Sequence, residues 1–203
     1  MDWFAKLQVL ARAQVAAGDE ALAPDWANDV VGFWFEELAA ADWFTKSDAT
    51  DDRIGERFLK VYHQVSQMPV AELSQCARTA LAGVIVLDQF PRNLFRGHRQ
   101  SFETDPKARA LAKAAIDAGF DREMTDDERV FLYLPFEHSE ALADQERAVQ
   151  LISAIGNDNY THYAVAHLDV IKQFGRFPHR NEALERVSTA QEAAYLARPG
   201  SGF

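Results

Sequence analysis

The sequence predicts an all-α protein of about eight antiparallel helices. Apolar residues recur at helical spacing along most of the 203 residues. No segment has the length and the period-two alternation of a paired β-strand. Helix start and stop signals follow one another at short intervals, without a Pro/Ser-rich linker, so we expect a single domain over residues 1–203.

The first half of the chain predicts three helices. One apolar helical face opens the chain, formed by Trp3, Phe4, Leu7, Leu10 and Val15. A second helix follows the acidic start at Asp51, with apolar residues at Ile54, Phe58, Val61 and Val65. Residues 70–89 are apolar on all sides and carry little charge after Arg78, which predicts a central, buried helix.

Capping signals divide the second half. Asp105 as N-cap, with Pro106 in the first helical position, predicts a helix that ends at Gly119. Capping boxes predict two more helix starts, at Thr125–Glu128 and at Thr189–Glu192.

Two further helices are predicted over residues 136–155 and 159–174, separated by a Gly-Asn turn. The regular succession of paired helices is compatible with both a helical bundle and an α-solenoid. No tetratricopeptide consensus is visible, so periodicity leaves both architectures open.

Two short stretches of the chain echo each other. Residues 88–93 read Asp-Gln-Phe-Pro-Arg-Asn, and residues 175–181 read Gly-Arg-Phe-Pro-His-Arg-Asn. We name them the first and the second Phe-Pro motif. Proline breaks a helix and disfavours helical backbone in the residue before it, so we expect both motifs at helix ends.

Polar side chains lie on the apolar faces of three predicted helices. His167 falls in the middle of the apolar side of residues 159–174, and His138 and Gln145 fall within the stripe of residues 136–155. Asp88 continues the stripe of residues 70–89 towards the helix end. A buried polar group without a partner costs about 1–3 kcal/mol, so we expect these groups to satisfy one another or a ligand.

The candidate catalytic residues are therefore Asp88, His138 and His167, with Asp88 as the partner of a histidine or an arginine. Arginines, amides and a histidine near the two motifs supply the candidate ligand-binding residues. These are Gln89, Arg92, Asn93, Arg96, Gln145, Arg176, His179, Arg180 and Asn181. The alternative is architectural, because such groups also satisfy the free carbonyls at helix ends and form structural ion pairs.

The sequence favours neither a metal nor a cofactor. Four of the six histidines fall in residues 138–179, but none forms a His-x-x-x-His or Glu-x-x-His pair that would present two ligands on one helix face. No Gly-rich phosphate loop and no Gly-x-Ser-x-Gly elbow is present. We read Glu137, Glu140 and Asp144 as a solvated or arginine-pairing stripe.

Composition excludes several classes of partner. The net charge is −10, with 31 acidic and 21 basic residues, which disfavours binding to nucleic acid or to an anionic membrane. No apolar run approaches the roughly 20 residues of a membrane span. The start of the chain lacks the features of a signal peptide, and Cys76 is the single cysteine. We therefore expect a cytoplasmic location.

Three longer motifs resemble a known family. They are residues 87–97, residues 133–140 and residues 174–181, and the aromatic pairs near Trp34 and Trp43 accompany them in the same order. The chain is identified as similar to the bacterial domain-of-unknown-function 924 family over residues 28–203, which leaves a lead-in over residues 1–27. The resemblance implies a tetratricopeptide-like antiparallel superhelix and supplies no function.

The chain departs from the family pattern at one position. Glu185 stands where the family has a glycine, so we expect this member to lack a glycine-dependent turn after the second motif.

Three functions compete. The first is a polar centre for a small anion or a peptide carboxylate, with a histidine as general base in a hydrolase or transferase reaction. The second is a tetratricopeptide-like interaction scaffold, in which the Arg/Asp/His network is structural. The third is a metal-dependent enzyme, which elemental analysis of the purified protein would test.

Overall fold

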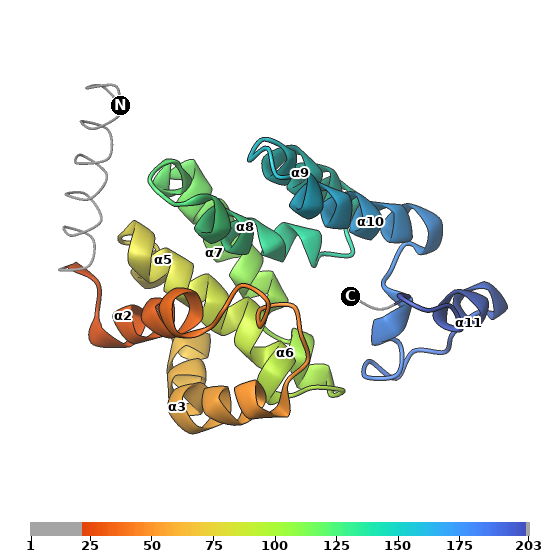
Figure 1. Ribbon diagram of the computed structural model, residues 1–203, viewed down its shortest axis with the longest axis horizontal. Helices are drawn as coiled ribbons and strands as arrows, with labels where there is room; N and C mark the ends of the chain where they lie inside the picture. The colour runs from red at the N-terminus through yellow and green to blue at the C-terminus, as the bar shows by residue number, and fades with distance from the viewer. Residues whose placement is uncertain (1–21, 202–203) are drawn as a thin grey trace.

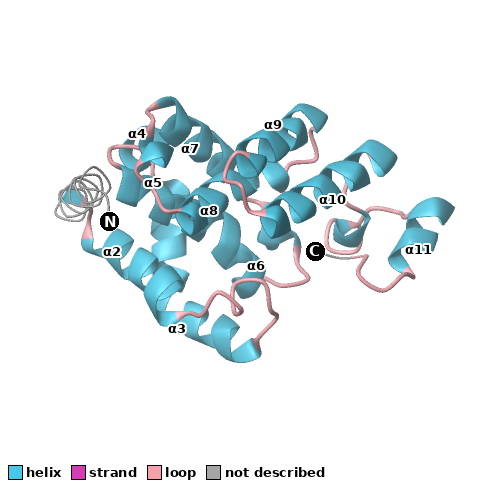
Figure 2. Cartoon of the chain, turned by 45° about the horizontal axis from the view of Figure 1, so that its top comes forward, coloured by secondary structure: helices cyan, strands magenta, loops and turns pink. Residues whose placement is uncertain are grey.

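The computed structural model describes residues 22–201, and every regular element in that range is helical (Figures 1 and 2). The α-helices are α2 (Asp25–Gly32), α3 (Asp48–Gln67), α4 (Val70–Leu73), α5 (Ala77–Val84), α6 (Phe90–Leu94), α7 (Asp105–Asp117), α8 (Asp126–Glu137), α9 (Leu142–Ser153), α10 (Asp158–Phe174) and α11 (Ala190–Leu196). The all-α prediction is confirmed. The predicted apolar face at the start of the chain, from Trp3 to Val15, lies outside the described residues.

Short helical turns of other types join these helices. Two are π-helical, η1 (Phe33–Glu37) and η2 (Ile85–Gln89), and three are 3₁₀ turns, η3 (Arg99–Phe102), η4 (Phe120–Arg122) and η5 (Pro178–Arg180). Of the helices between residues 22 and 201, none is both long and apolar enough to span a bilayer.

The helices pack both on their neighbours in the chain and on helices further along it. Helix α5 contacts α2 and α7, α8 contacts α7 and α9, and α10 lies against α9. Figures 1 and 2 show α8, α9 and α10 side by side, with α11 beyond the end of α10. The arrangement is consistent with a helical bundle, and the tetratricopeptide-like superhelix stays a prediction.

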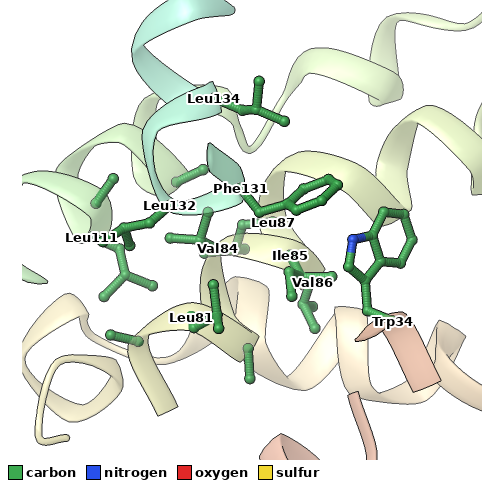
Figure 3. Close-up of a cluster of buried hydrophobic side chains, with 14 of the residues drawn as sticks. Trp34, Leu81, Val84, Ile85, Val86, Leu87, Leu111, Phe131, Leu132 and Leu134 are labelled. Atoms are coloured by element: carbon green, nitrogen blue, oxygen red, sulfur yellow. The ribbon is translucent and has the colours of Figure 1, made fainter. Parts of the chain in front are cut away.

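The hydrophobic core centres on the predicted central helix. Leu81, Val84 and Leu87 are buried against Leu111 of α7 and Phe131 of α8 (Figure 3). Burying each such side chain contributes about 1.5–3 kcal/mol, which favours a fixed position for this segment. The end of η2, where Asp88 lies, is therefore held rigidly by the core.

The central segment differs from the predicted helix 70–89 in two ways. It is interrupted after Leu73, and α5 begins only at Ala77. It also continues past Pro91 and stops at Leu94, directly after the first Phe-Pro motif. That motif therefore lies at a helix end, as predicted, but its proline does not break the helix. The π-helical turn η2 ends at Gln89, two residues before the proline, and its wider turn accommodates a residue that would break a regular α-helix.

The predicted helix 136–155 is two helices. Helix α8 extends through Pro135 and ends at Glu137, and α9 begins at Leu142. The prediction that His138 and Gln145 share one helix face is therefore wrong. Gln145 is buried, as predicted, and its amide donates to the carbonyls of Glu137 and Ser139, so it ties α9 to the end of α8.

Local capping signals were predicted well. Both capping boxes form, at Thr125–Glu128 and at Thr189–Glu192. Gly119 follows the end of α7 with a φ of 80°, as a helix-ending glycine should. The N-cap of α7 is Thr104 rather than Asp105, because the Asp105 carboxylate pairs with arginines instead.

The second Phe-Pro motif also lies at a helix end. Helix α10 stops at Gly175, which has a φ of 70°. The turn after the motif is also left-handed, because Glu185 has a φ of 55° and the Arg186 amide donates to the Asn181 carbonyl at 2.7 Å. The expectation that Glu185 would abolish this turn is wrong, since the backbone of Glu185 adopts the left-handed conformation without a glycine.

Candidate functional site

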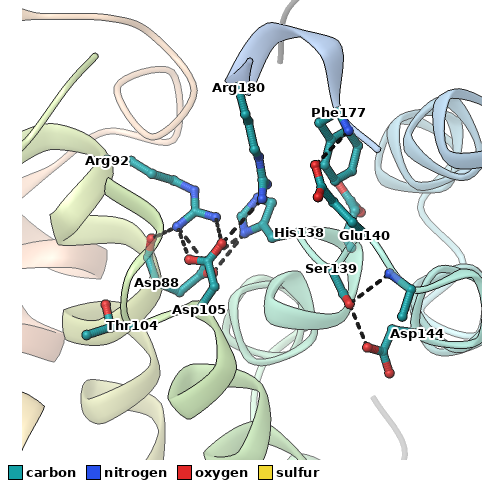
Figure 4. Close-up of polar contacts among 12 residues, drawn as sticks. Asp88, Arg92, Thr104, Asp105, His138, Ser139, Glu140, Asp144, Phe177 and Arg180 are labelled. Atoms are coloured by element: carbon teal, nitrogen blue, oxygen red, sulfur yellow. Dashed lines mark hydrogen bonds and ion pairs between the residues drawn. The ribbon is translucent and has the colours of Figure 1, made fainter. Parts of the chain in front are cut away.

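Four separated segments bring polar side chains to one centre. Asp88 and Arg92 come from the η2–α6 segment, Asp105 from the first turn of α7, His138 from the end of α8, and Arg180 from η5 (Figure 4). We call these five residues the Arg–Asp–His centre. Both Phe-Pro motifs contribute to it, the first through Asp88 and Arg92 and the second through Arg180.

Asp88 and His138 form the middle of the centre. Nδ1 of His138 lies 2.9 Å from each carboxylate oxygen of Asp88. Asp88 is completely buried, and the Gln89 amide also donates to it at 2.6 Å. Because a carboxylate only accepts hydrogen bonds, His138 holds its proton on Nδ1, and Nε2 of the neutral ring is a proton acceptor.

The charges around Asp88 keep it ionised. Burial alone would raise the pKa of Asp88, but the charge of Arg92 and the hydrogen bonds from His138 and Gln89 outweigh burial and lower the pKa to about 2. Arg92 lies 3.4 Å from this carboxylate and also donates to the Asp88 backbone carbonyl. The pKa of His138 is lowered, first by burial and then by Arg92, so the ring is neutral at neutral pH.

Asp105 joins the two motifs. Arg92 binds its carboxylate with two parallel hydrogen bonds of 3.0 and 3.1 Å. Arg180, from the other motif, lies 3.4 Å from the same carboxylate. One acidic side chain therefore serves two buried guanidinium groups.

Arg180 is fixed between two aromatic rings. Its guanidinium carbon lies 4.6 Å from the centre of the Phe102 ring and 4.5 Å from that of Phe177. Its side chain is 7% exposed, and its Nε is buried without a hydrogen-bond partner in the described part of the chain. Burial and the nearby charge of Arg92 lower the pKa of Arg180 to about 10, so it remains cationic.

A second histidine lies beside the centre. The His167 ring is centred 6.2 Å from the His138 ring, and its Nδ1 donates to the Tyr163 carbonyl at 2.8 Å. The same Nδ1 lies 3.1 Å from the Glu137 carboxyl group. Burial, reinforced by His138, lowers the pKa of His167 to about 3. Asp88 therefore orients His138 and not His167.

Glu137 was not expected in this region. It is buried, and burial together with the negative charge of Asp88 raises its pKa to about 8. The stripe prediction is wrong for Glu137. It is confirmed for Glu140 and Asp144, which pair with Arg186 at 2.8 Å and with Arg109 at 3.1 Å.

The structure separates several other predicted residues from the centre. Asn93 and Arg96 both bind Asp51 of α3, at 2.7 and 2.8 Å. Arg176 binds Glu192 of α11 at 2.6 Å, and the Asn181 amide donates to Ser188 at 3.0 Å. These contacts connect each motif to a neighbouring element. His179 lies next to Arg180 and within 5.5 Å of the Phe177 ring.

Sequence reasoning missed Asp105, Glu137 and the two phenylalanines that flank Arg180. The sequence does single out Asp105, but the proline that follows it indicates a helix N-cap and not a partner for arginines. Glu137 precedes His138 directly, and only the end of α8 at this point turns both side chains inward. Among residues 22–201, no group of three or more His, Cys, Asp and Glu side chains is arranged to hold a metal ion.

The protein is thus an all-helical protein in which two motifs that are far apart in the sequence meet at an Arg–Asp–His cluster. The chain belongs to the DUF924 family, described as bacterial proteins of unknown function, whose family model matches residues 30–200. Among curated proteins, none matches the chain.

One solved structure is similar to this protein. It is a protein of unknown function, ATU0120, from Agrobacterium tumefaciens. The two chains are 40% identical, with a TM-score of 0.80, and the match covers 84% of this chain and 96% of the other. The family membership predicted from the motifs is confirmed.

Proposed function

We propose that the Arg–Asp–His centre binds a small anion or the terminal carboxylate of a peptide. The observation that carries the proposal is the incomplete pairing of Arg180. A guanidinium group has five N–H donors, and in this buried environment each unpaired donor is unfavourable. Arg180 has a single carboxylate contact, at 3.4 Å, and its Nε has no partner among the described residues.

The neighbours of Arg180 favour an external ligand over a protein one. Asp105 already accepts the two parallel hydrogen bonds of Arg92, so it is not available for a second bidentate pair. The rings of Phe102 and Phe177 hold the guanidinium plane in place, so little side-chain entropy would be lost on binding. The oxygens of a carboxylate or phosphate ligand would accept hydrogen bonds from the N–H groups of Arg180 that have no acceptor among the described residues.

His138 gives the centre a catalytic group. Asp88 fixes its tautomer, so Nε2 accepts a proton, and this is the arrangement of a general base. Arginines close to the same point would stabilise negative charge that develops in a reaction. We propose a hydrolase or transferase reaction on an anionic substrate, in the cytoplasm, where the buried thiol of Cys76 would stay reduced.

Calorimetric titration of the purified protein tests the binding proposal. The probes are acetate, sulfate, and a short peptide compared with the same peptide amidated at its C-terminus. Arg180→Ala should weaken anion binding at least about tenfold, since a hydrogen bond to a charged group is worth about 1.5–3 kcal/mol. Arg96→Ala is the matched control, because Arg96 lies just after the first motif and binds Asp51. No anion binding, or equal binding by Arg180→Ala, would refute the proposal.

The second candidate is the interaction scaffold. Phe44 favours it, because this side chain is 62% exposed and stacks on the buried Phe131 ring at 5.9 Å. An exposed aromatic on a rigid support is typical of a peptide-binding surface. Co-purification from the native host, with Phe44→Ala as the comparison, tests this candidate. A partner that wild type and Phe44→Ala recover equally would contradict it.

A further inference from the structure

The Arg–Asp–His centre is electrically balanced before any ligand arrives. Arg92 and Arg180 carry two positive charges, and Asp88 and Asp105 carry two negative charges. The three contacts that join these groups are the pair of bonds between Arg92 and Asp105, the 3.4 Å contact of Arg92 with Asp88 and the 3.4 Å contact of Arg180 with Asp105. An anion that binds Arg180 therefore adds a third negative charge to a neutral cluster.

The other groups that face the centre do not change this balance. Glu140 is neutralised by Arg186, whose two nitrogens lie 2.8 and 2.9 Å from its oxygens. Glu137 of α8 is buried beside a neutral imidazole, and no arginine or lysine of residues 22–201 pairs with it, so it holds its proton at neutral pH. His167 of α10 and His179 of η5 are neutral because burial lowers the pKa of each.

His138 is the one member of the centre that is ready to gain a charge. Its Nδ1 already donates to both oxygens of an ionised aspartate, and this contact stabilises the imidazolium form. Its side chain is 14% exposed, against 7% for His167, so its protonated form is less costly to solvate. In the part of the chain that the structure describes, His138 makes its hydrogen bonds through Nδ1, so the lone pair of Nε2 is the site where a proton would bind.

We propose that the centre binds an anion together with one proton, which His138 takes up. This inference rests on the proposed anion site. The proton comes from the solvent buffer and forms a new N–H bond at Nε2. The imidazolium then donates from Nδ1 to Asp88 and from Nε2 towards the anion, and the third negative charge is compensated. While the anion is bound, His138 is therefore a proton donor, and it returns to the base form of the proposed reaction when it gives this proton to the substrate.

Calorimetry measures this proton directly. Acetate is titrated into the full-length protein at one pH, in two zwitterionic buffers that differ in ionisation enthalpy. The dependence of the observed heat on the buffer gives the number of protons taken up, and we expect a value that approaches one per acetate. His138→Gln should bind acetate without proton uptake. His167→Gln is the matched control and should keep the uptake, because His167 binds the Tyr163 carbonyl and not Asp88.

The wild-type protein provides a test that needs no variant. Acetate stays ionised from pH 6 to pH 8, so any pH dependence of its affinity comes from the protein. We expect affinity to fall as pH rises, by up to roughly tenfold per pH unit.

The outcomes separate the two proposals. Acetate binding with no proton uptake and a flat pH profile overturns the proton coupling and leaves the anion site standing. Uptake that persists in His138→Gln also overturns the assignment to His138. If wild type binds neither acetate nor sulfate, both proposals fail together.

Discussion

The two Phe-Pro motifs are almost the same in sequence and differ in structure. The first continues a helix through its proline, with a π-helical turn before it. The second follows a helix end at a left-handed glycine and forms a 3₁₀ turn. The order Phe-Pro before Arg and Asn therefore does not determine the backbone. The residues before each Phe-Pro pair do, because the first pair continues an apolar helix and the second follows the left-handed Gly175 that ends α10.

Despite this difference, the motifs divide their arginines in the same way. Each sends one arginine to the shared carboxylate of Asp105, Arg92 from the first motif and Arg180 from the second. A second arginine in or next to each motif binds a neighbouring helix: Arg96, just after the first motif, binds Asp51, and Arg176 of the second motif binds Glu192. The two motifs therefore meet through Asp105, a third residue that lies in neither of them.

Removing the shared carboxylate should have the largest effect. Asp105→Asn leaves the buried Arg180 without its counter-charge and leaves Arg92 with Asp88 as its remaining carboxylate partner, and we expect the free energy of unfolding to fall by about 3–5 kcal/mol. Urea denaturation measures the change. Asp51→Asn is the control, because it breaks a more exposed pair and should cost about 1 kcal/mol or less. Equal effects of the two variants would show that the motifs do not depend on Asp105.

The protonation of Glu137 should be visible in the pH dependence of stability. Its pKa rises from an ordinary value of 4.5 to about 8 on folding, so the folded state holds a proton that the unfolded state releases between these values. Wild-type stability should therefore decrease relative to Glu137→Gln as pH rises from 5 to 8, by up to about 1.4 kcal/mol per pH unit. Urea denaturation across this range tests the sign.

His167 supplies the matched control for that measurement, because its folded pKa of about 3 lies below the ordinary 6.5. The unfolded state then binds more protons below pH 6.5, so His167 destabilises the protein as pH falls. His167→Gln should therefore remove the part of the pH dependence in which stability decreases as pH falls, which is opposite in sign to the effect of Glu137. If the free energy of unfolding of Glu137→Gln changed with pH in parallel with that of wild type between pH 5 and 8, a protonated Glu137 would be ruled out.

The helix end before the second motif should depend on glycine. Gly175→Ala is expected to destabilise the protein by about 1 kcal/mol, because alanine is strained at a φ of 70°. No described atom lies within 4 Å of the added Cβ, so the cost comes from the backbone and not from a clash. Thermal denaturation measures this loss of stability. If Gly175→Ala were as stable as wild type, the end of α10 would not depend on the left-handed backbone of Gly175.

The smallest effect is expected at Glu185. This residue has a φ of 55° in the turn after the second motif, and Glu185→Gly relieves the strain while it makes the unfolded chain more flexible. We expect a net gain of about 0.5 kcal/mol or less, measured as a small rise in melting temperature. A marked loss of stability would mean that the Glu185 side chain contributes a contact that outweighs the strain.

Much of the fold was predictable because its signals are local. Thr125 and Glu128, or Thr189 and Glu192, need only each other to form a capping box, so sequence spacing was enough. The pairing of Asp88 with a histidine was also predictable, because a buried acid requires a partner. The sequence did not predict which histidine pairs with Asp88, since His138 and His167 both lie on apolar faces of predicted helices.

The rest of the centre depended on partners far away in the chain. Asp105 lies 75 residues before Arg180, and the same aspartate would have been an ordinary N-cap if no arginine had reached it. Likewise, Glu137 at the end of α8 is buried beside His167 of α10, 3.1 Å away and 30 positions later in the chain. The break at His138 depends on Gln145, which satisfies carbonyls on the other side of the turn.

The sequence by itself determined the helical class, most helix boundaries and the family, because periodicity and caps act over a few residues. The tertiary structure alone decided which arginine meets which acid, and which histidine Asp88 orients. The physical reason is that charges select partners by distance in space. Four segments had to pack before Arg92, Arg180 and His138 shared one centre.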